Sequence, residues 1–176
     1  MSVPYVLFDR DGTLIKHIHY LVDPNQVELM PEIVPALTLL KQEGFSFGII
    51  SNQSAIGRGI GTQNQVESVN ARLLELLAVH GFNFSFAMFC PHAPKDQCEC
   101  RKPGIALGIT AIEQHDLEPR ISFMIGDKIS DVIFGHALGC QSIQVGDEIE
   151  FSSEADFATS DLLSAAKWIC TRLKGD

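Results

Sequence analysis

Two aspartates one residue apart follow the first apolar run of the chain. Asp9 and Asp11 come directly after the run at 3–8, and Gly12 and Thr13 follow them. Alternate residues of an extended segment point the same way, so both carboxylates can reach one substrate atom or one metal ion. In open α/β sheets, ligands bind at the carboxyl ends of the strands, where this pair would lie. The pair is a candidate for acid–base or metal chemistry, although an ordinary turn would also place Asp before Gly.

Polar residues follow three further apolar runs. Ser51 follows the second run, Lys102 follows a loop after the third, and Asp127 follows the fourth, with Asp131 four positions later. Together with the aspartate pair they suit phosphoryl transfer, because a carboxylate can attack phosphorus and form an acyl phosphate. Carboxylates also supply the hard oxygen ligands that Mg²⁺ takes. A hydroxyl and a lysine can neutralise the phosphoryl oxygens as charge spreads over them.

A cysteine-rich loop lies between the third apolar run and Lys102. Cys90, His92, Cys98 and Cys100 place four metal-binding side chains within one short segment. Three cysteines and a histidine form a common closed tetrahedral zinc set, and a closed set is structural because it leaves no position for water. Zinc would order a loop that holds little apolar material and leads to Lys102. The alternative is a group of unligated thiols that could be reactive.

The motifs lie on a regular alternation of apolar runs and helical patterns. Such alternation with short connections predicts a parallel sheet covered by helices on both faces. Thr62 and Gln65 have the spacing of a capping box at the start of one helix. The segment 17–30 is too long for a tight turn and is interpreted as a functional flap. We predict strands at 3–8, 45–50, 84–89, 121–125 and 141–145, and helices at 32–43, 62–81, after 103–104, at 129–138 and at 162–173.

The composition is that of an ordinary globular protein. The 176 residues, 45% of them hydrophobic and 20% charged, favour a single domain over residues 1–176. No apolar run reaches the ~18 residues of a membrane span, and the N-terminus lacks a cleavable leader, so we expect a cytoplasmic protein with no membrane partner. A net charge of −9 argues against nucleic acid as the main partner. We expect a monomer.

In their order along the chain, the motifs resemble those of the haloacid dehalogenase (HAD) superfamily of phosphatases. The matching segments are Asp9–Thr13, Ser51, Lys102 and Asp127–Asp131. The resemblance implies an α/β fold with a Rossmann-like, doubly wound parallel sheet. It also implies a capless HAD fold with a zinc-binding loop, because the gaps between the motifs leave no room for a large cap domain.

The resemblance further implies a role for each motif residue. Asp9 would be the nucleophile, and Asp11 would protonate the leaving oxygen and then activate the hydrolytic water. Ser51 and Lys102 would position the phosphoryl group. The expected Mg²⁺ ligands are Asp9, the backbone carbonyl of Asp11, and Asp127, with Asp131 supporting the metal shell.

The cysteine-rich loop and the segment after Ser51 resemble a narrower branch, that of D-glycero-D-manno-heptose 1,7-bisphosphate 7-phosphatases and histidinol-phosphatases. In the heptose pattern a serine follows Asn-Gln and an arginine precedes glycine, as Ser54 and Arg58 do here. A bisphosphate brings a second anion, which Arg58 and Arg101 could bind. The expected substrate is this phosphorylated sugar, in lipopolysaccharide synthesis. The expected substrate contacts are Arg10, His17, Tyr20, Asn52, Gln53, Ser54, Arg58, Arg101 and Lys128.

Three alternatives stay open at this point. Histidinol phosphate could be the substrate, because the same branch contains histidinol-phosphatases. A zinc-stabilised binding module could keep the fold without turnover. A redox protein could instead use the clustered thiols, which would then be titratable without a chelator.

Overall fold

The strands of this protein form one parallel sheet. The computed structural model describes residues 3–146 and 154–172. Within this part of the chain six strands pair in the order β3-β2-β1-β4-β5-β6, and every pairing is parallel. This is the Rossmann strand order, in which the direction of winding reverses beside β1 and leaves a crevice at the carboxyl ends of the strands. The strands are β1 (Tyr5–Phe8), β2 (Ser46–Asn52), β3 (Phe86–Cys90), β4 (Phe123–Gly126), β5 (Gln141–Val145) and β6 (Phe157–Thr159).

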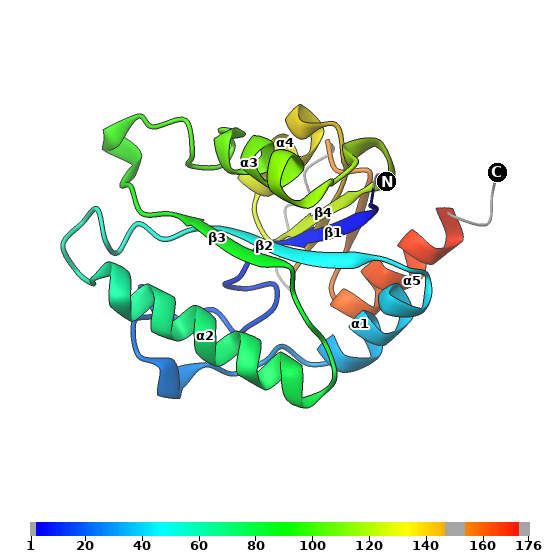
Figure 1. Ribbon diagram of the computed structural model, residues 1–176, viewed down its shortest axis with the longest axis horizontal. Coiled ribbons are helices and arrows are strands. Elements are labelled where there is room, and N and C mark those ends of the chain that lie inside the picture. Colours follow the sequence, from blue (N-terminus) through cyan, green and yellow to red (C-terminus); the bar gives the residue numbers. More distant parts are fainter. Residues whose placement is uncertain (1–2, 147–153, 173–176) are drawn as a thin grey trace.

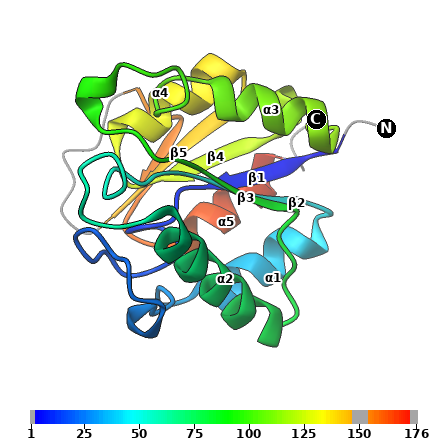
Figure 2. The same cartoon turned by 60° about the vertical axis from the view of Figure 1, so that its left-hand side comes forward.

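Helices cover both faces of the sheet (Figures 1 and 2). One face carries α1 (Ile33–Gln42), α2 (Gln63–Val79) and α5 (Leu162–Arg172), and the other carries α3 (Ala106–His115) and α4 (Ile129–Leu138). In the described residues, short 3-10 helices lie in the loops: η1 (Pro24–Gln26), η2 (Pro94–Asp96) and η3 (Pro119–Ile121).

Strand β1 is buried on both sides, which explains its unbroken apolar sequence. Val6 and Phe8 belong to the core cluster formed with α1, α2 and α5. Tyr5 and Leu7 belong to the cluster formed with α3 and α4. A central parallel strand needs apolar residues on both faces. The strand ends at Phe8, so the next residue, Asp9, lies at the edge where the crevice opens.

The predicted fold is confirmed, with one strand that the prediction missed. The strand at 141–145 and the helix at 129–138 have the predicted bounds, and the ends of the other predicted strands differ by at most two residues. The capping box of Thr62 and Gln65 is present at the start of α2. Strand β6 is only three residues long, too short to show an alternation of apolar and polar residues. Leu173, the predicted last residue of the final helix, lies outside the described residues.

The loops at the carboxyl ends of the strands build the site. The 17–30 segment contains only η1, and backbone bonds close its base, from Lys16 N to Glu28 O at 2.9 Å and from Met30 N to Leu14 O at 2.9 Å. Among the described residues, β1, β2 and β3 are linked without an inserted domain, in agreement with a capless fold. In the same residues, no helix is both long and apolar enough to cross a membrane.

Candidate active site

A cavity of about 310 Å³ lies at the carboxyl ends of β1, β2 and β4. Four predicted catalytic or metal residues line it: Asp9, Asp11, Lys102 and Asp131. Seven predicted substrate contacts also line it: His17, Tyr20, Asn52, Gln53, Ser54, Arg101 and Lys128. His19 and Ser130 line it too, and neither was among the predicted substrate contacts. A larger space of about 920 Å³ borders Asp127 from the side of Thr13 and Glu32, away from Lys102.

Lys102 connects the first and last motifs. Its Nζ lies 2.8 Å from Asp9 Oδ1 and 2.6 Å from Asp131 Oδ1, and it donates to Ile50 O at 2.6 Å. The lysine is buried, at 3% exposure. Burial by itself would lower the pKa of the Lys102 ammonium, but the charges of Asp131 and Asp9 outweigh burial and raise that pKa. Lys102 is therefore a fixed cation beside Asp9, where phosphoryl oxygens would need neutralising.

Asn52 fixes the backbone of Lys102. Its side-chain Nδ2 donates to Lys102 O at 3.0 Å, and its Oδ1 accepts from Lys102 N at 2.9 Å. Asn52 lies at the cavity wall, as expected of a substrate contact. Both ends of its amide, however, are hydrogen-bonded to the backbone of Lys102.

Asp9, Asp127 and Asp131 form a group that fits a metal ion. One carboxylate oxygen from each lies within 4.8 Å of the others. Burial and the charge of Asp9 raise the pKa of Asp127 to about 7, and burial above all raises that of Asp131. Asp127 Oδ1 is buried without a hydrogen-bond partner among the described residues. Clustered acids with an unpartnered buried oxygen need a cation, and an all-oxygen donor set suits Mg²⁺.

Gly12 makes room for Asp127. Its φ is +81°, a conformation that favours glycine, and a Cβ added there would lie 2.7 Å from Asp127 Oδ2. The turn after Asp11 therefore needs glycine both for its backbone and for the close approach of the metal-site carboxylate.

Arg10, a predicted substrate contact, is buried and does not line the cavity. The side chain is fully buried, and its Nε lies 3.0 Å from Asp11 Oδ2. Gln53 Nε2 donates to the same oxygen at 2.8 Å and to Ser51 Oγ at 3.2 Å. A guanidinium carries five N–H donors, and when it is buried these donors must find acceptors inside the protein. Arg10 therefore holds the carboxylate of Asp11 in place. Ser51, which accepts from Gln53, is also buried and does not line the cavity.

Arg58 also lies away from the cavity wall. It is exposed, and its guanidinium carbon is 5.9 Å from the centre of the Tyr20 ring. The Tyr20 ring in turn lies 3.9 Å from that of His19. Arg58 thus contacts the 17–30 flap. Tyr20 lines the cavity, whereas Arg58 packs against Tyr20 and does not line it.

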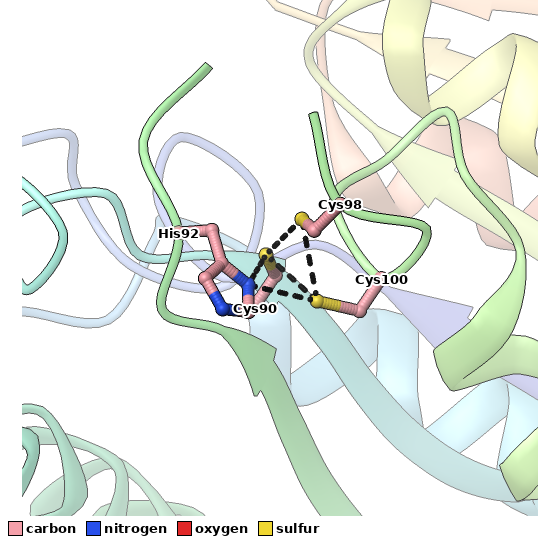
Figure 3. Close-up of side chains that lie close together, drawn as sticks. All are labelled: Cys90, His92, Cys98 and Cys100. Atoms are coloured by element: carbon pink, nitrogen blue, oxygen red, sulfur yellow. Dashed lines mark hydrogen bonds between the residues drawn. The ribbon is translucent and has the colours of Figure 1, made fainter. Parts of the chain in front are cut away.

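The four predicted zinc ligands converge in space (Figure 3). The sulfur atoms of Cys90, Cys98 and Cys100 lie 3.1–3.5 Å apart, and His92 Nδ1 lies 3.5 Å from Cys90 Sγ and 3.2 Å from Cys100 Sγ. A tetrahedral zinc site with bonds of ~2.3 Å has edges of ~3.8 Å, close to these separations. Burial favours the neutral thiol, but hydrogen bonds from Cys100 and Cys90 lower the pKa of Cys98 to about 7. The donor set and its spacing fit zinc.

This cluster is joined to the active site through hydrogen bonds to the backbone carbonyls of its loop. Gln53 N donates to Cys90 O at 2.8 Å, and Gly57 N donates to Pro91 O at 2.8 Å. Arg101 Nη1 donates to His92 O at 3.3 Å. The cluster therefore supports both the loop after β2 and the segment that leads to Lys102.

Known proteins resemble this chain in sequence and in fold. Residues 99–169 match the family model described as HAD-hydrolase-like. The chain is also 31% identical, over 193 aligned residues, to the D-glycero-D-manno-heptose-1,7-bisphosphate 7-phosphatase of Thermosynechococcus vestitus, and the alignment covers 98% of each. The chain belongs to the haloacid dehalogenase superfamily of phosphatases.

Other relatives within this superfamily differ in length. A bifunctional histidine biosynthesis protein of Actinobacillus pleuropneumoniae is 35% identical over 147 residues, which are 82% of this chain and 40% of that protein. The chain thus spans about two fifths of that relative. The crystal structure of D,D-heptose 1,7-bisphosphate phosphatase from B. bronchiseptica has the same fold, with a TM-score of 0.85, 21% identity, and coverage of 97% of this chain and 99% of that one.

Proposed function

We propose that this protein is a Mg²⁺-dependent phosphatase that removes the 7-phosphate of D-glycero-D-manno-heptose 1,7-bisphosphate. The observation that carries the proposal is the convergence of Lys102 with Asp9 and Asp131 beside Asp127. A relative from Thermosynechococcus vestitus, 31% identical, is named as a D-glycero-D-manno-heptose-1,7-bisphosphate 7-phosphatase, and one from Thermoplasma volcanium, 33% identical, bears the same name preceded by "probable". These names support the proposed substrate.

The residues of the cavity can carry out the reaction in two displacements. A carboxylate oxygen of Asp9 bonds to phosphorus while the bond from phosphorus to the sugar oxygen breaks, and Asp11 gives that oxygen its proton. Asp11, now a base, takes a proton from water, whose oxygen attacks phosphorus and frees Asp9 and phosphate. Lys102 neutralises the phosphoryl oxygens throughout.

Asp9, Asp127 and the backbone carbonyl of Asp11 would hold Mg²⁺, with Asp131 in support. The crystal structure of the B. bronchiseptica phosphatase, which has this fold, is described as complexed with magnesium and phosphate. When bound, the ion supplies positive charge for the phosphoryl oxygens. The raised pKa values of Asp127 and Asp131 are consistent with carboxylates that need such a charge to stay ionised.

Cationic side chains at the cavity suit a substrate with a second phosphate. Arg101 and Lys128 line it, in a chain whose net charge is −9. Local cations offset the overall negative field, which would otherwise repel a bisphosphate. Tyr20, His17 and Ser54 complete the proposed wall for the sugar. We further propose a structural zinc at the Cys90 cluster, and a monomeric, single-domain cytoplasmic enzyme of lipopolysaccharide synthesis.

Histidinol phosphate is the second candidate substrate, favoured by the 35% identity to the histidine biosynthesis protein. The deciding experiment measures phosphate release from heptose 1,7-bisphosphate and histidinol phosphate, with Mg²⁺, in parallel. We expect kcat/KM for the bisphosphate to be larger by at least ~10-fold, because its second anion adds charge-assisted contacts. The reverse preference would assign the alternative substrate and leave the catalytic residues in place. No release from either, for the wild type, would favour a binding module, and Asp9→Asn should abolish any turnover that is found.

A further inference from the structure

We propose that Asn70, on helix α2, is a positioning residue for catalysis that acts on Asp11 through Arg10. This inference rests on the proposed role of Asp11 as acid and base. The sequence motifs gave no reason to select Asn70, because it lies 60 positions from Arg10 in the middle of a helix.

The side chain of Arg10 is held from three directions. Its Nη1 donates to Asn70 Oδ1 at 2.9 Å, and its Nη2 donates to Gln53 Oε1 at 2.8 Å. The remaining bonds go to Asp11, from Nη2 to Oδ1 at 3.2 Å and from Nε to Oδ2 at 3.0 Å. Both carboxylate oxygens of Asp11 are therefore held by the planar guanidinium, whose orientation depends on the acceptors on its other side.

The hydrogen bond to Arg10 explains why a polar residue, Asn70, occupies a buried position of α2. It is buried at 6% exposure on the face of α2 that also buries Val66, Val69 and Leu73. Asparagine is a weak helix former. A buried amide also costs free energy unless it is hydrogen-bonded. The amide oxygen of Asn70 meets that need at Arg10 Nη1, which has no other hydrogen-bond acceptor among the described residues.

Loss of this acceptor should turn the guanidinium and move Asp11. Nη1 would be left unpaired in the interior, so Arg10 would shift toward another acceptor. The carboxylate of Asp11 would then leave its position relative to the leaving oxygen. A displacement of ~1 Å can reduce a rate by ~10²-fold when the displaced group transfers a proton.

The test compares two phosphate esters. The leaving alcohol of heptose 1,7-bisphosphate needs a proton, whereas p-nitrophenolate leaves readily without one. In Asn70→Leu, which has a similar shape and no acceptor, kcat/KM for the sugar phosphate should fall at least ~10-fold. For p-nitrophenyl phosphate it should fall less than ~3-fold, because kcat/KM reports the steps up to departure of the leaving group.

Two further variants complete the comparison. Asn70→Asp keeps an acceptor oxygen and should restore the sugar phosphate rate to within ~3-fold of wild type. Asn64→Leu makes the same change at an exposed position of α2 and should alter neither rate.

Each other outcome overturns the inference. Equal losses with both esters would mean that Asn70 is only structural, and no loss would mean that Arg10 does not need it. If Asn70→Leu does not fold, Asn70→Ala carries the same test, because it also removes the acceptor of Arg10 Nη1, and it should show the same dependence on the ester. Wild-type inactivity toward both esters would overturn the proposed function together with this inference. An active wild type with no ester-dependent loss would overturn the inference alone.

Discussion

Lys102 Nζ lies 2.8 Å from Asp9 Oδ1, although 93 positions separate the two residues in the chain. The contact is buried, with side-chain exposures of 1% for the lysine and 8% for the aspartate. Since Lys102 also pairs with Asp131, one cation compensates two acids. The same pair therefore serves stability and, in the proposed mechanism, neutralises charge at the nucleophile.

Removal of this cation should cost both folding free energy and activity. Lys102→Met leaves Asp9 and Asp131 facing each other without compensation, and breaking a buried ion pair in this way costs ~3–5 kcal/mol. We expect the free energy of unfolding to fall by about that amount, and turnover to be lost. Urea unfolding followed by the fluorescence of Trp168, the chain's one tryptophan, measures the first effect. Lys128→Met is the control: that side chain is 56% exposed, so stability should change by less than ~0.5 kcal/mol.

The sequence predicted the strands and most of the residues that line the candidate cavity, because both depend on local patterns. Buried parallel strands give apolar runs, and Asp9, Lys102 and Asp127 follow such runs at the same edge of the sheet. The environment of Arg10 could not be predicted from local patterns. It lies between two predicted catalytic acids in the sequence, yet it is buried and donates a hydrogen bond to Asn70, which comes from another element.

Asn52 and Arg58 illustrate the same limit. The sequence predicts both as substrate contacts. In the structure Asn52 lines the cavity and its amide also holds the Lys102 backbone, whereas Arg58 lies against Tyr20 of the flap. These roles depend on how separate loops meet, which residue type and spacing do not specify. The short strand β6 was missed for a different reason, because three residues give no pattern to detect.

Gly12→Ala should weaken Mg²⁺ activation. The added methyl group would press on Asp127 Oδ2, and the positive φ would add strain. We expect a loss of ~1 kcal/mol in stability from the backbone and an apparent Mg²⁺ affinity lower by ~10-fold or more, as for disturbed metal-site neighbours. Activity measured against Mg²⁺ concentration tests this. Gly44→Ala is the matched control: its φ is +88° with nothing within 4 Å, so it should lose similar stability and keep its Mg²⁺ dependence. Equal Mg²⁺ curves for both variants would contradict the assigned metal site.

Asp161 should stabilise the start of α5 in a pH-dependent way. Its Oδ1 accepts from Ser164 N at 2.7 Å, and this bond lowers the pKa of Asp161 below its ordinary value. A carboxyl group with a lower pKa in the folded state contributes stability that is present above its unfolded pKa of ~3.9 and is lost as pH falls through the folded pKa. Asp161→Ala should cost ~1 kcal/mol at pH ~7.

Asp161→Asn separates the hydrogen bond from the charge. Asparagine can also cap a helix, so this variant should keep most of the stability at neutral pH. Because it cannot titrate, the difference between wild type and variant should shrink as the pH is lowered toward ~3. Urea midpoints at several pH values, read by Trp168 fluorescence, provide the comparison. A difference that does not change with pH would show that the carboxylate charge adds nothing at this helix end.

Zinc removal should expose three thiols together. The chain has five cysteines, of which Cys90, Cys98 and Cys100 belong to the cluster with His92. If these thiols hold zinc they are bound as thiolates and shielded from thiol reagents. The purified protein should therefore contain about one zinc per chain, and a strong chelator should make three further cysteines reactive in one step. Fast reaction of all three without chelator would instead support a redox role.

Two serine variants and an activity measurement make this zinc prediction specific. Cys98→Ser should lower the zinc content, whereas Cys170→Ser, outside the cluster, should leave it unchanged. Loss of zinc should also reduce phosphatase activity, because the backbone of Cys90 and His92 supports Gln53 and Arg101 at the cavity. Since Lys102 and Asp9 keep their own contact, the loss should affect KM for the sugar phosphate more than kcat. A chelated protein with unchanged KM and reduced kcat would show that the cluster instead orders Lys102 itself.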